Sequence, residues 1–391
     1  MPAQPITALD LNTKKVLVRC DFNVPLREGK ITDTERIDAS MDTIRYVLEK
    51  GGSAVLCSHL GRPKERSPEL SLKPVAEYLS TLLGKKVALA PDCIGEVSGR
   101  MVETLKPGEA ILLENLRFHP EEEANDRDFA HELARGKQVY INDAFGSAHR
   151  PHASTVGVTK FIPIRAAGFL MMRELEALRA VMDNPERPAI AILGGAKVSD
   201  KIGVIKSFIQ RLDAILIGGA MAYTFLKAQG TPIGKSRVEE DKLDLARELL
   251  TEARSKNKRI VLPIDHVVAL APDAVASIAV MTDIPADMIG LDIGPATVDA
   301  FIAEIARART VIWNGPLGFF EIPEFSHGTM RVGEALANQP GVKSLIGGGD
   351  TAAAVGHQPW AKQFTHISTG GGATLEFLEG IELPGVKALE G

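Results

Sequence analysis

Short runs of β-branched and aliphatic residues recur along the first half of the chain, and each run ends in glycine or polar residues. The runs lie at 16–18, 54–56, 87–89, 111–113 and 139–141. Between them lie stretches with apolar residues at helical spacing, for example at 38–50 and 73–83. Strands that alternate with helices predict a mostly parallel sheet that helices cover on both faces.

A charged, helix-forming segment at 168–182 comes next, and it ends in the breaker cluster Asp-Asn-Pro-Glu-Arg-Pro at 183–188. After this connector the strand pattern starts again, with short strand-like runs at 190–193, 215–217, 311–313, 345–346 and 365–368. The segment 266–283 has no long helical period and predicts a short hairpin. We therefore predict an α/β protein with two Rossmann-like doubly wound parallel-sheet domains, each a three-layer α/β/α structure, joined by a hinge helix.

The composition fits ordinary globular domains. The 391 residues correspond to two or three domains at about 150 residues each. Hydrophobic residues make up 45%, and the net charge of −5 gives no reason to expect a nucleic acid or an anionic membrane as partner. No apolar run reaches the roughly 18 residues of a membrane span, and the first residues lack a leader pattern. The isolated Cys20, Cys57 and Cys93 indicate neither zinc nor disulfides, so a cytoplasmic location is expected.

One glycine-rich stretch suggests a phosphate site. Residues 344–355 read Ser-Leu-Ile-Gly-Gly-Gly-Asp-Thr-Ala-Ala-Ala-Val, which predicts a buried strand, a tight turn and a helix start. A helix N-terminus favours phosphate, but Asp350 would repel phosphate unless a cation bridged the two, which points to Mg²⁺. The alternative is a structural turn in which Asp350 caps the helix.

A second glycine turn precedes two lysines. Gly194-Gly-Ala-Lys-Val-Ser-Asp-Lys201 follows an apolar run, and at helical spacing Lys197 and Lys201 would share one face. An anion between them would relieve their repulsion. The alternative is a solvated helix face.

The first half carries guanidinium and other polar groups where the second half carries glycines. These groups follow predicted strands or turns: Asp21, Asn23, Arg36, His59, Arg62, Arg117 and Arg150. Guanidinium forks suit a small anion, and close glycine backbone suits the phosphates of a nucleotide. Because ligands of open α/β sheets bind at the carboxyl ends of the strands, we expect one ligand in each lobe. A lone arginine is more often a surface charge. That Arg36, Arg62, Arg117 and Arg150 converge on one ligand is therefore a hypothesis.

Other motifs leave weaker alternatives. Residues 230–236 look like a P-loop, but their two glycines are one residue too close and they follow an apparent helix. Residues 347–352 match a loose dinucleotide fingerprint, although the next strand ends without the expected acid. No GxSxG or HExxH motif occurs. A nicotinamide dehydrogenase and a non-catalytic anion-binding protein remain open.

Taken in order, these motifs resemble those of the phosphoglycerate kinase family. The matching segments include Val18-Arg-Cys-Asp-Phe-Asn-Val-Pro25, Ser58-His-Leu-Gly-Arg-Pro-Lys64 and Val311-Ile-Trp-Asn-Gly-Pro-Leu-Gly318. Further matches lie at 112–119, 142–146, 148–150, 194–201, 290–295, 347–351 and 368–372, so the resemblance covers nearly the whole chain. The chain departs from the family pattern at 32–36, at Ser147 and at Pro151.

The resemblance implies a monomeric, Mg²⁺-dependent kinase. It would catalyse reversible, direct in-line phosphoryl transfer between 1,3-bisphosphoglycerate and ADP, giving 3-phosphoglycerate and ATP, and its domains would close around the substrates. It also implies a phosphoglycerate domain at 1–167, a hinge at 168–188, a nucleotide domain at 189–374 and a terminal segment at 375–391 that returns to the first domain.

The resemblance also implies roles for individual residues. The phosphoglycerate would be held by Asp21, Asn23, Arg36, His59, Leu60, Gly61, Arg62, Arg117 and Arg150. The nucleotide would be held by Lys201, Gly218, Gly219, Leu291, Asn314, Glu321, Gly347, Gly348, Gly349, Asp350 and Thr351, with Asp350 towards the metal. The residues at the transferred group would be Arg36, Lys197, Lys201, Gly371 and Gly372.

Overall fold

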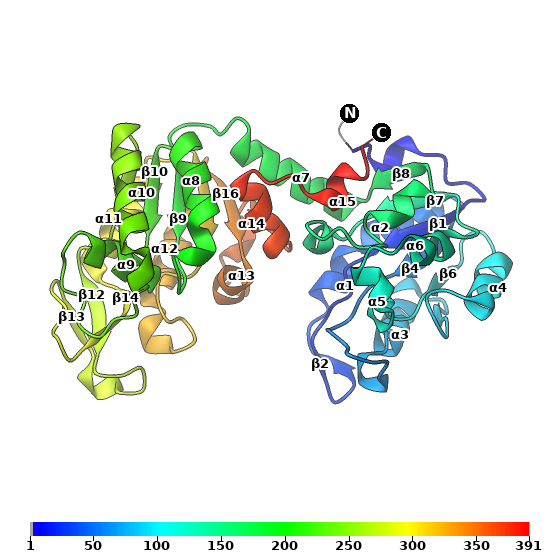
Figure 1. Cartoon of the computed structure of the whole chain (residues 1–391), viewed down its shortest axis with the longest axis horizontal. Helices are drawn as coiled ribbons and strands as arrows, with labels where there is room; N and C mark the ends of the chain where they lie inside the picture. The colour runs from blue at the N-terminus through cyan, green and yellow to red at the C-terminus, as the bar shows by residue number, and fades with distance from the viewer. Residues whose placement is uncertain (1–2, 391) are drawn as a thin grey trace. The chain divides into compact units, whose positions relative to one another are not determined.

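The computed structural model describes residues 3–390, and it divides into two compact units (Figure 1). Unit 1 comprises the chain up to Leu175 together with the segment from Glu382 onward, and unit 2 comprises Glu176–Ile381. The division falls within helix α7 (Phe169–Met182), inside the predicted connector. Within the described part of the chain, no helix is both long and apolar enough to cross a bilayer.

Unit 1 is built on a six-stranded sheet in which every paired neighbour is parallel. Its order is β5-β6-β4-β1-β7-β8. The strands are β1 (Lys15–Arg19), β4 (Ser53–Cys57), β5 (Ala88–Leu89), β6 (Ala110–Leu112), β7 (Val139–Asn142) and β8 (Ile164–Ala167). Central β1 pairs with β4 and β7, so that Val18 lies between Leu56 and Ile141.

Helices cover both faces of this sheet. The helices before α7 are α1 (Glu35–Ala39), α2 (Met41–Glu49), α3 (Lys73–Leu83), α4 (Glu96–Thr104), α5 (Pro120–Glu123) and α6 (Arg127–Ala134). Apolar residues of α2 and α3, such as Ile44 and Leu79, form one core with alternate strand residues such as Val16 and Leu56. Right-handed crossovers place α4 and α6 on the opposite face. The short α15 (Pro384–Lys387) also belongs to unit 1, where Gly385 N–H donates to the Ala148 carbonyl.

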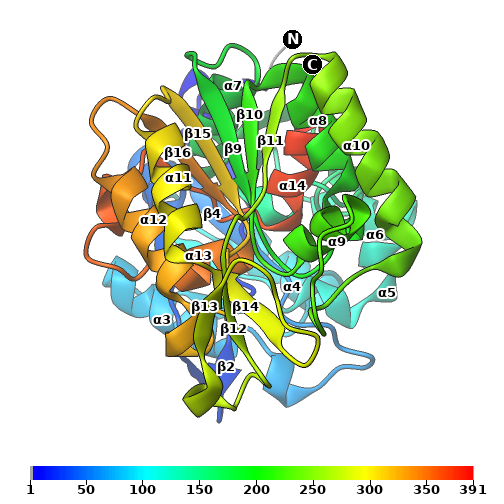
Figure 2. The ribbon, with the colours of Figure 1, turned by 90° about the vertical axis from the view of Figure 1, so that its left-hand side faces the viewer.

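Unit 2 has a second six-stranded sheet with parallel pairing, in the order β11-β10-β9-β15-β16-β17 (Figure 2). The strands are β9 (Ala189–Leu193), β10 (Ala214–Ile217), β11 (Arg259–Val261), β15 (Thr310–Asn314), β16 (Lys343–Gly347) and β17 (His366–Ile367). In order of sequence this is 3-2-1-4-5-6, the order of a dinucleotide-binding sheet. The predicted doubly wound fold class is therefore confirmed in both units.

Helices flank this sheet as well. They are α8 (Ile202–Arg211), α9 (Met221–Ala228), α10 (Leu243–Ser255), α11 (Pro295–Ile305), α12 (His327–Ala337), α13 (Gly349–Val355) and α14 (Gly372–Glu379). Figure 2 shows α8 and α10 on one side of the strands and α11 and α12 on the other. Phe301 of α11 and Val332 of α12 join Trp313 in the core of that second side.

Two small antiparallel elements complete the fold. The predicted hairpin in 266–283 is present as β12 (His266–Ala269) and β13 (Ala279–Met281), and β14 (Ile289–Ile293) adds an unpredicted third strand. In unit 1, β2 (Leu26–Arg27) and β3 (Lys30–Ile31) form a hairpin that the sequence reading missed. Both of its turn residues, Glu28 and Gly29, have positive φ, as a tight hairpin turn requires.

Candidate active site

Unit 2 contains a pocket of about 520 Å³ at the carboxyl ends of β9, β10 and β15. It lies where the strand order reverses, between β9 and β15, which is where α/β sheets bind their ligands. Turns supply much of its wall, and β14 of the small sheet supplies one side. Among the residues that line it are Gly195, Gly219, Leu291, Leu317, Glu321 and Asp350.

The backbone forms part of the pocket wall because two turns approach each other without side chains between them. Gly219 has a φ of +65°, and a Cβ placed there would lie 2.6 Å from the backbone nitrogen of Gly195. Gly218, just before it, packs against Leu317. No larger residue fits at Gly219 without moving backbone, so a ligand here meets peptide groups directly.

The turn at 347–351 continues this wall. Gly348 has a φ of +91° and stands at the N-cap of α13, and no side chain among residues 3–390 caps that helix. The alternative in which Asp350 caps the helix is therefore wrong. The Thr351 hydroxyl accepts from the Gly315 N–H at 2.6 Å and donates to the Gly347 carbonyl at 2.9 Å, which ties the turns after β15 and β16 together. Asp350 is exposed and lines the pocket.

Asn314, the last residue of β15, is fully buried beside this turn. Neither its Oδ1 nor its Nδ2 has a hydrogen-bond partner within residues 3–390. A Cβ on Gly348 would lie 2.8 Å from Nδ2, so the amide adjoins the glycine turn. Leaving a buried amide unpaired is costly, and a ligand with polar groups would relieve that cost.

The structure corrects the predicted lysine pair. Residues 194–198 are irregular, a 3-10 turn occupies Ser199–Lys201, and α8 begins only at Ile202, so Lys197 and Lys201 do not share a helix face. The cause is Glu239, whose carboxylate accepts from the backbone N–H groups of Val198 and Ser199 and from the Ser199 hydroxyl.

The two lysines differ in their surroundings. Lys197 is exposed in the loop. Burial lowers the pKa of Lys201 to about 8, although the nearby carboxylates of Asp350, Asp200 and Glu379 oppose the shift. Lys201 therefore stands beside Asp350, whereas Lys197 makes no hydrogen bond or ion pair with any residue that the structure describes.

The remaining predicted residues of unit 2 lie on other turns. Gly371, with a φ of +51°, and Gly372 begin α14 after strand β17. The P-loop-like segment follows α9 rather than a strand, as expected, and yet its Lys235 lines the pocket together with Arg237. Sequence reasoning missed both cations, and the Gly-Lys-Ser pattern was the available signal.

In unit 1 most of the predicted residues lie together at the carboxyl ends of β1, β4 and β6, and several of them are joined by hydrogen bonds. Arg36 of α1 makes an ion pair with Asp21 at 2.9 Å. Gly61 joins two others, because its N–H donates to Asn23 Oδ1 at 2.8 Å and its carbonyl accepts from Arg117 at 2.7 Å. Leu60 is buried, and its backbone is held by the side chain of Asn115.

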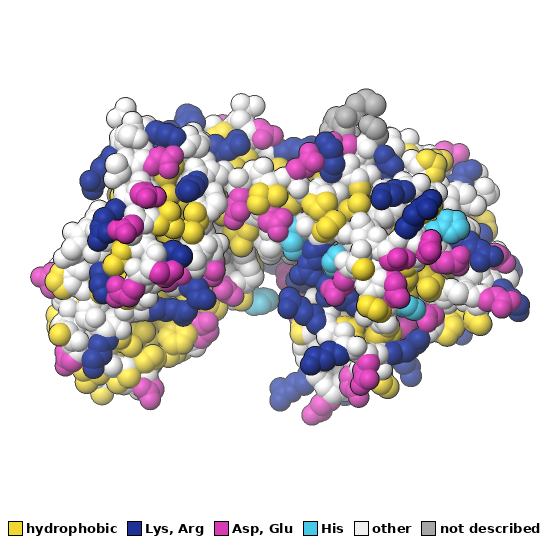
Figure 3. Space-filling view, in the orientation of Figure 1, with side chains coloured by type: hydrophobic (Ala, Val, Ile, Leu, Met, Phe, Trp, Pro, Cys, Tyr) yellow, Lys and Arg dark blue, Asp and Glu magenta, His cyan; other side chains and the backbone are white. Residues whose placement is uncertain are grey.

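His59 lies at the centre of this network and is almost fully buried. Burial lowers its pKa well below the usual range, and the positive charges of Arg19, Arg117, Arg150 and Arg36 lower it further. The positive charges of three of the four predicted arginines thus act on one imidazole, whose low pKa keeps it neutral near pH 7. Arg62 is exposed and makes none of these contacts. Figure 3 shows Lys and Arg side chains over α1 and the β2–β3 hairpin of the same unit.

Arg19 was missed by the sequence reading. It is the last residue of β1 and only 1% exposed, and its guanidinium reaches His59 Nδ1 at 3.1 Å. An arginine inside a buried strand, directly before Cys20 and Asp21, was a signal that the apolar run concealed.

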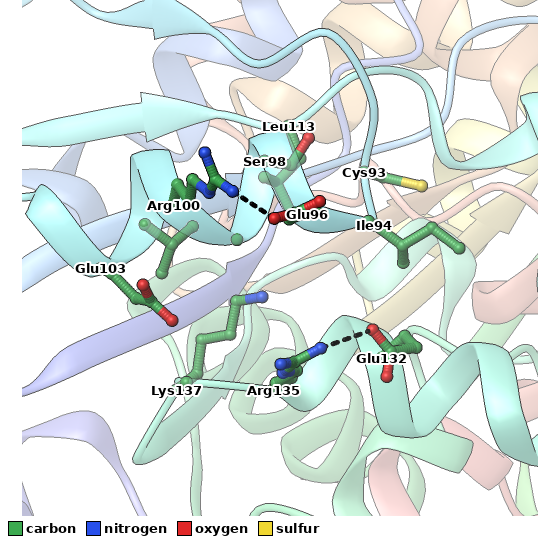
Figure 4. Close-up of a pocket in the computed structure, with 14 residues that line it drawn as sticks. Cys93, Ile94, Glu96, Ser98, Arg100, Glu103, Leu113, Glu132, Arg135 and Lys137 are labelled. Atoms are coloured by element: carbon green, nitrogen blue, oxygen red, sulfur yellow. Dashed lines mark hydrogen bonds and ion pairs between the residues drawn. The ribbon is translucent and has the colours of Figure 1, made fainter.

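Unit 1 also has a smaller pocket, of about 220 Å³, between α4 and the end of α6 (Figure 4). Its charges are largely paired, since Arg100 bonds Glu96 and Arg135 lies 3.6 Å from Glu132. Burial lowers the pKa of Lys137 there to about 8. No predicted site residue lines this pocket, and the nearby cluster of Asp92, Cys93 and His119 holds its aspartate and histidine 2.7 Å apart in a direct contact.

Comparisons with known proteins agree with this geometry. A family model described as phosphoglycerate kinase matches residues 6–381. A phosphoglycerate kinase of Dictyoglomus turgidum is 54% identical over 383 residues, which cover 97% of this chain and 96% of the relative. One of Koribacter versatilis is 53% identical, with 98% of each chain covered. The solved structure of phosphoglycerate kinase from Coxiella burnetii is 40% identical, covers 99% of both chains and has a TM-score of 0.92.

Proposed function

The chain belongs to the phosphoglycerate kinase family, and from that premise we propose how its two units share the reaction. It is a glycolytic kinase, which transfers a phosphoryl group between the carboxyl phosphate of 1,3-bisphosphoglycerate and ADP. The proposed division rests above all on one observation: in unit 1 the buried His59 contacts Arg19 at 3.1 Å and lies within the positive field of further arginines. In unit 2, by contrast, backbone lines a pocket at the switch point of the sheet.

Unit 1 binds the phosphoglycerate. Arg36, Arg117 and Arg150 supply the positive charge, and guanidinium forks match both the phosphate and the carboxylate of this ligand. Asp21 and Asn23 hold Arg36 and Gly61 in place, and Arg62 reaches the ligand from the exposed loop. The low pKa of His59 lets it donate a hydrogen bond without adding a further charge.

Unit 2 binds the nucleotide. Gly218, Gly219 and Leu291 flank the adenine, whereas Glu321 and the unpaired amide of Asn314 meet the ribose and phosphates. Lys201 and the 347–351 turn hold the phosphate chain. The exposed carboxylate of Asp350 fits Mg²⁺, which commonly takes one protein carboxylate together with phosphate oxygens. When bound, Mg²⁺ supplies charge neutralisation at the phosphates.

The transfer itself needs charge stabilisation rather than a nucleophilic side chain. The transition state spreads negative charge over equatorial oxygens, so that positioned cations and N–H donors lower the barrier. Arg36, Lys197 and the N–H groups of Gly371 and Gly372 fill this role. The ligands bind to different units, so the units close on a hinge at 168–188 to bring them in line and exclude water. The enzyme acts as a monomer in the cytoplasm.

The deciding experiment supplies 1,3-bisphosphoglycerate and ADP and follows ATP, with and without Mg²⁺. ATP formation that requires Mg²⁺ is the expected result. Phosphoglycerate binding without ATP would indicate a non-catalytic anion-binding protein, and NAD binding in a fluorescence titration would revive the dehydrogenase alternative. Asp350→Asn should weaken ADP binding in Mg²⁺ but not in EDTA, and equal losses in both would remove Asp350 from the metal site.

A further inference from the structure

A buried chain of polar groups lies behind His59, on the side away from its free nitrogen. It begins at Glu122 in α5, a carboxylate that is fully buried. The carboxylate accepts twice from Ser154, from its hydroxyl at 2.5 Å and from its backbone N–H at 2.9 Å. Ser154 is itself held by Tyr140, whose hydroxyl donates to the Ser154 carbonyl at 2.7 Å. The two bonds from Ser154, one to each oxygen, therefore fix the orientation of the Glu122 carboxylate.

The chain continues through Ser154 to Arg19. The Arg19 Nε–H donates to the Ser154 hydroxyl at 2.8 Å, another donor reaches the Cys20 carbonyl, and Nη2 lies 3.1 Å from His59 Nδ1. A guanidinium has donors only and stays protonated inside proteins. His59 Nδ1 must therefore accept, and the ring proton must sit on Nε2. His59 Nε2 makes no hydrogen bond to another residue of the described chain.

The charges agree with this arrangement. Arg19 and Glu122 are both buried, and the charges of Arg19 and Arg117 act on the Glu122 carboxylate. Arg117 also pairs with the exposed Glu123 at 3.0 Å. Burial raises the pKa of Glu122, whereas Arg19 and the bonds from Ser154 oppose the rise. His152 Nδ1 lies 3.9 Å from the same carboxylate, and burial together with the arginines lowers its pKa to about 4, so it adds no competing charge near neutral pH.

We propose that Glu122 is a positioning residue for phosphoglycerate. Through Ser154 it holds the Arg19 guanidinium, and Arg19 fixes His59 in the tautomer that presents Nε2–H to the anionic ligand. The inference rests on the proposed binding of phosphoglycerate by unit 1. It adds that the ligand's hydrogen bond to His59 depends on a carboxylate that the ligand never touches.

The first test is ¹⁵N NMR of the histidine rings in the wild-type enzyme, with the His59 signals assigned from their loss in His59→Gln. We expect a protonated Nε2 and an unprotonated Nδ1. A proton on Nδ1 would overturn the proposal without any variant of the buried chain.

The second test removes parts of the chain of contacts. Glu122→Gln and Ser154→Ala should each raise the KM for 3-phosphoglycerate about tenfold, the loss of one charge-assisted hydrogen bond, with the KM for MgATP unchanged. The His59 ¹⁵N signals should move towards a mixture of tautomers. Ser154→Thr keeps the hydroxyl and should restore both readouts.

Glu121→Gln is the matched control, because Glu121 is the exposed neighbour of Glu122 on the same helix and should change nothing. If Glu122→Gln does not fold, Ser154→Ala and the wild-type spectrum decide the question. Unchanged KM and unchanged His59 signals in a folded Ser154→Ala or Glu122→Gln enzyme would refute the positioning role. If the wild-type enzyme does not bind 3-phosphoglycerate at all, the proposed function fails instead.

Discussion

Each unit has its candidate site at the carboxyl edge of its own parallel sheet. The two sites are nevertheless formed by different kinds of groups. In unit 1 charged side chains already have partners, since Arg36 of α1 pairs with Asp21 and Arg117 donates to the backbone carbonyl of Gly61. In unit 2 the corresponding turns carry glycines, and the polar groups of Asn314 and Lys197 have no partners in the described chain. In the proposed function, the phosphoglycerate site would therefore be organised before its ligand arrives, whereas the nucleotide site would be completed by its ligand.

The difference matches what each ligand demands. A small anion offers few contacts, so that its binding depends on charges fixed in advance. A nucleotide is long enough to lie along backbone, where peptide N–H groups and close approach replace side chains. The strand orders differ as well, since unit 1 inserts β6 between β4 and β5 whereas unit 2 keeps the dinucleotide-binding order.

The largest effect is expected at Lys197 of unit 2. It tests whether this side chain stabilises the transition state rather than the bound nucleotide. Lys197→Ala should lower kcat at least about 100-fold, the scale of losing one charge aimed at the transition state, while MgADP affinity stays within about twofold. Steady-state kinetics and calorimetry measure the two. Lys206→Ala, an exposed lysine on α8, is the control. Parallel losses of kcat and affinity would place Lys197 in ground-state binding instead.

The next prediction concerns Arg117 of unit 1, whose side chain is already held by a hydrogen bond to Gly61. Arg117→Ala should raise the KM for 3-phosphoglycerate about 10- to 100-fold, since charge-assisted hydrogen bonds are lost, and should leave ADP binding unchanged. Arg127→Ala changes an exposed arginine of α6 and serves as control. A matching loss of ADP affinity would show that the two sites are not divided between the units.

A structural feature can be predicted from the sequence when the residues that cause it are neighbours in the chain. It cannot when they lie far apart in the chain. Helix α3 is predicted to the residue because its apolar spacing and its left-handed cap at Gly84 are adjacent in sequence. The lysine pair was wrong because Glu239, some forty residues away, holds the backbone before α8 in a turn. No local pattern could reveal that contact.

The same reasoning explains the site residues. Glycine turns and arginines at strand ends follow from a general rule about parallel sheets, so their positions could be predicted. The buried arginine at position 19 was a visible signal, but its role could not be assigned because its partners Ser154 and His59 lie on other segments. The P-loop interpretation of residues 230–236 was rejected, and Lys235 was therefore not predicted as a site residue. Lys235 nevertheless lines the pocket, so a segment that fails a motif can still belong to the site.

A smaller effect tests the close approach of backbone to the nucleotide. A Cβ on Gly349 would meet nothing within 4 Å of protein, so Gly349→Ala should leave Tm unchanged. If phosphate lies against this turn, the added methyl should weaken ADP binding about fivefold, which corresponds to about 1 kcal/mol of overpacking. Gly99→Ala in α4 of unit 1 is equally open and is the matched control. Wild-type ADP affinity in Gly349→Ala would refute the close approach.

The last prediction concerns the interior of the two units below their candidate sites, where we expect the units to behave alike. Both units contain a buried carboxyl whose pKa is raised to about 7 by burial: Asp143 in unit 1 and Asp292 in unit 2. Asp143 accepts from the N–H groups of Leu170 and Met171 at the start of α7, and Asp292 accepts from those of Gly328 and Ile293.

Because each folded pKa lies above the unfolded value of 3.8, the folded state keeps its proton longer, so each group lowers the free energy of unfolding as pH rises from about 4 to about 7. Asp143→Asn and Asp292→Asn remove this dependence. In thermal unfolding, Tm of each variant minus that of wild type should therefore be more positive at pH 8 than at pH 5, by about 2 °C for each kcal/mol. Exposed Asp128→Asn should show no such change. A response in only one unit would mean that the other carboxyl is already ionised near pH 5, with its two N–H donors outweighing burial there.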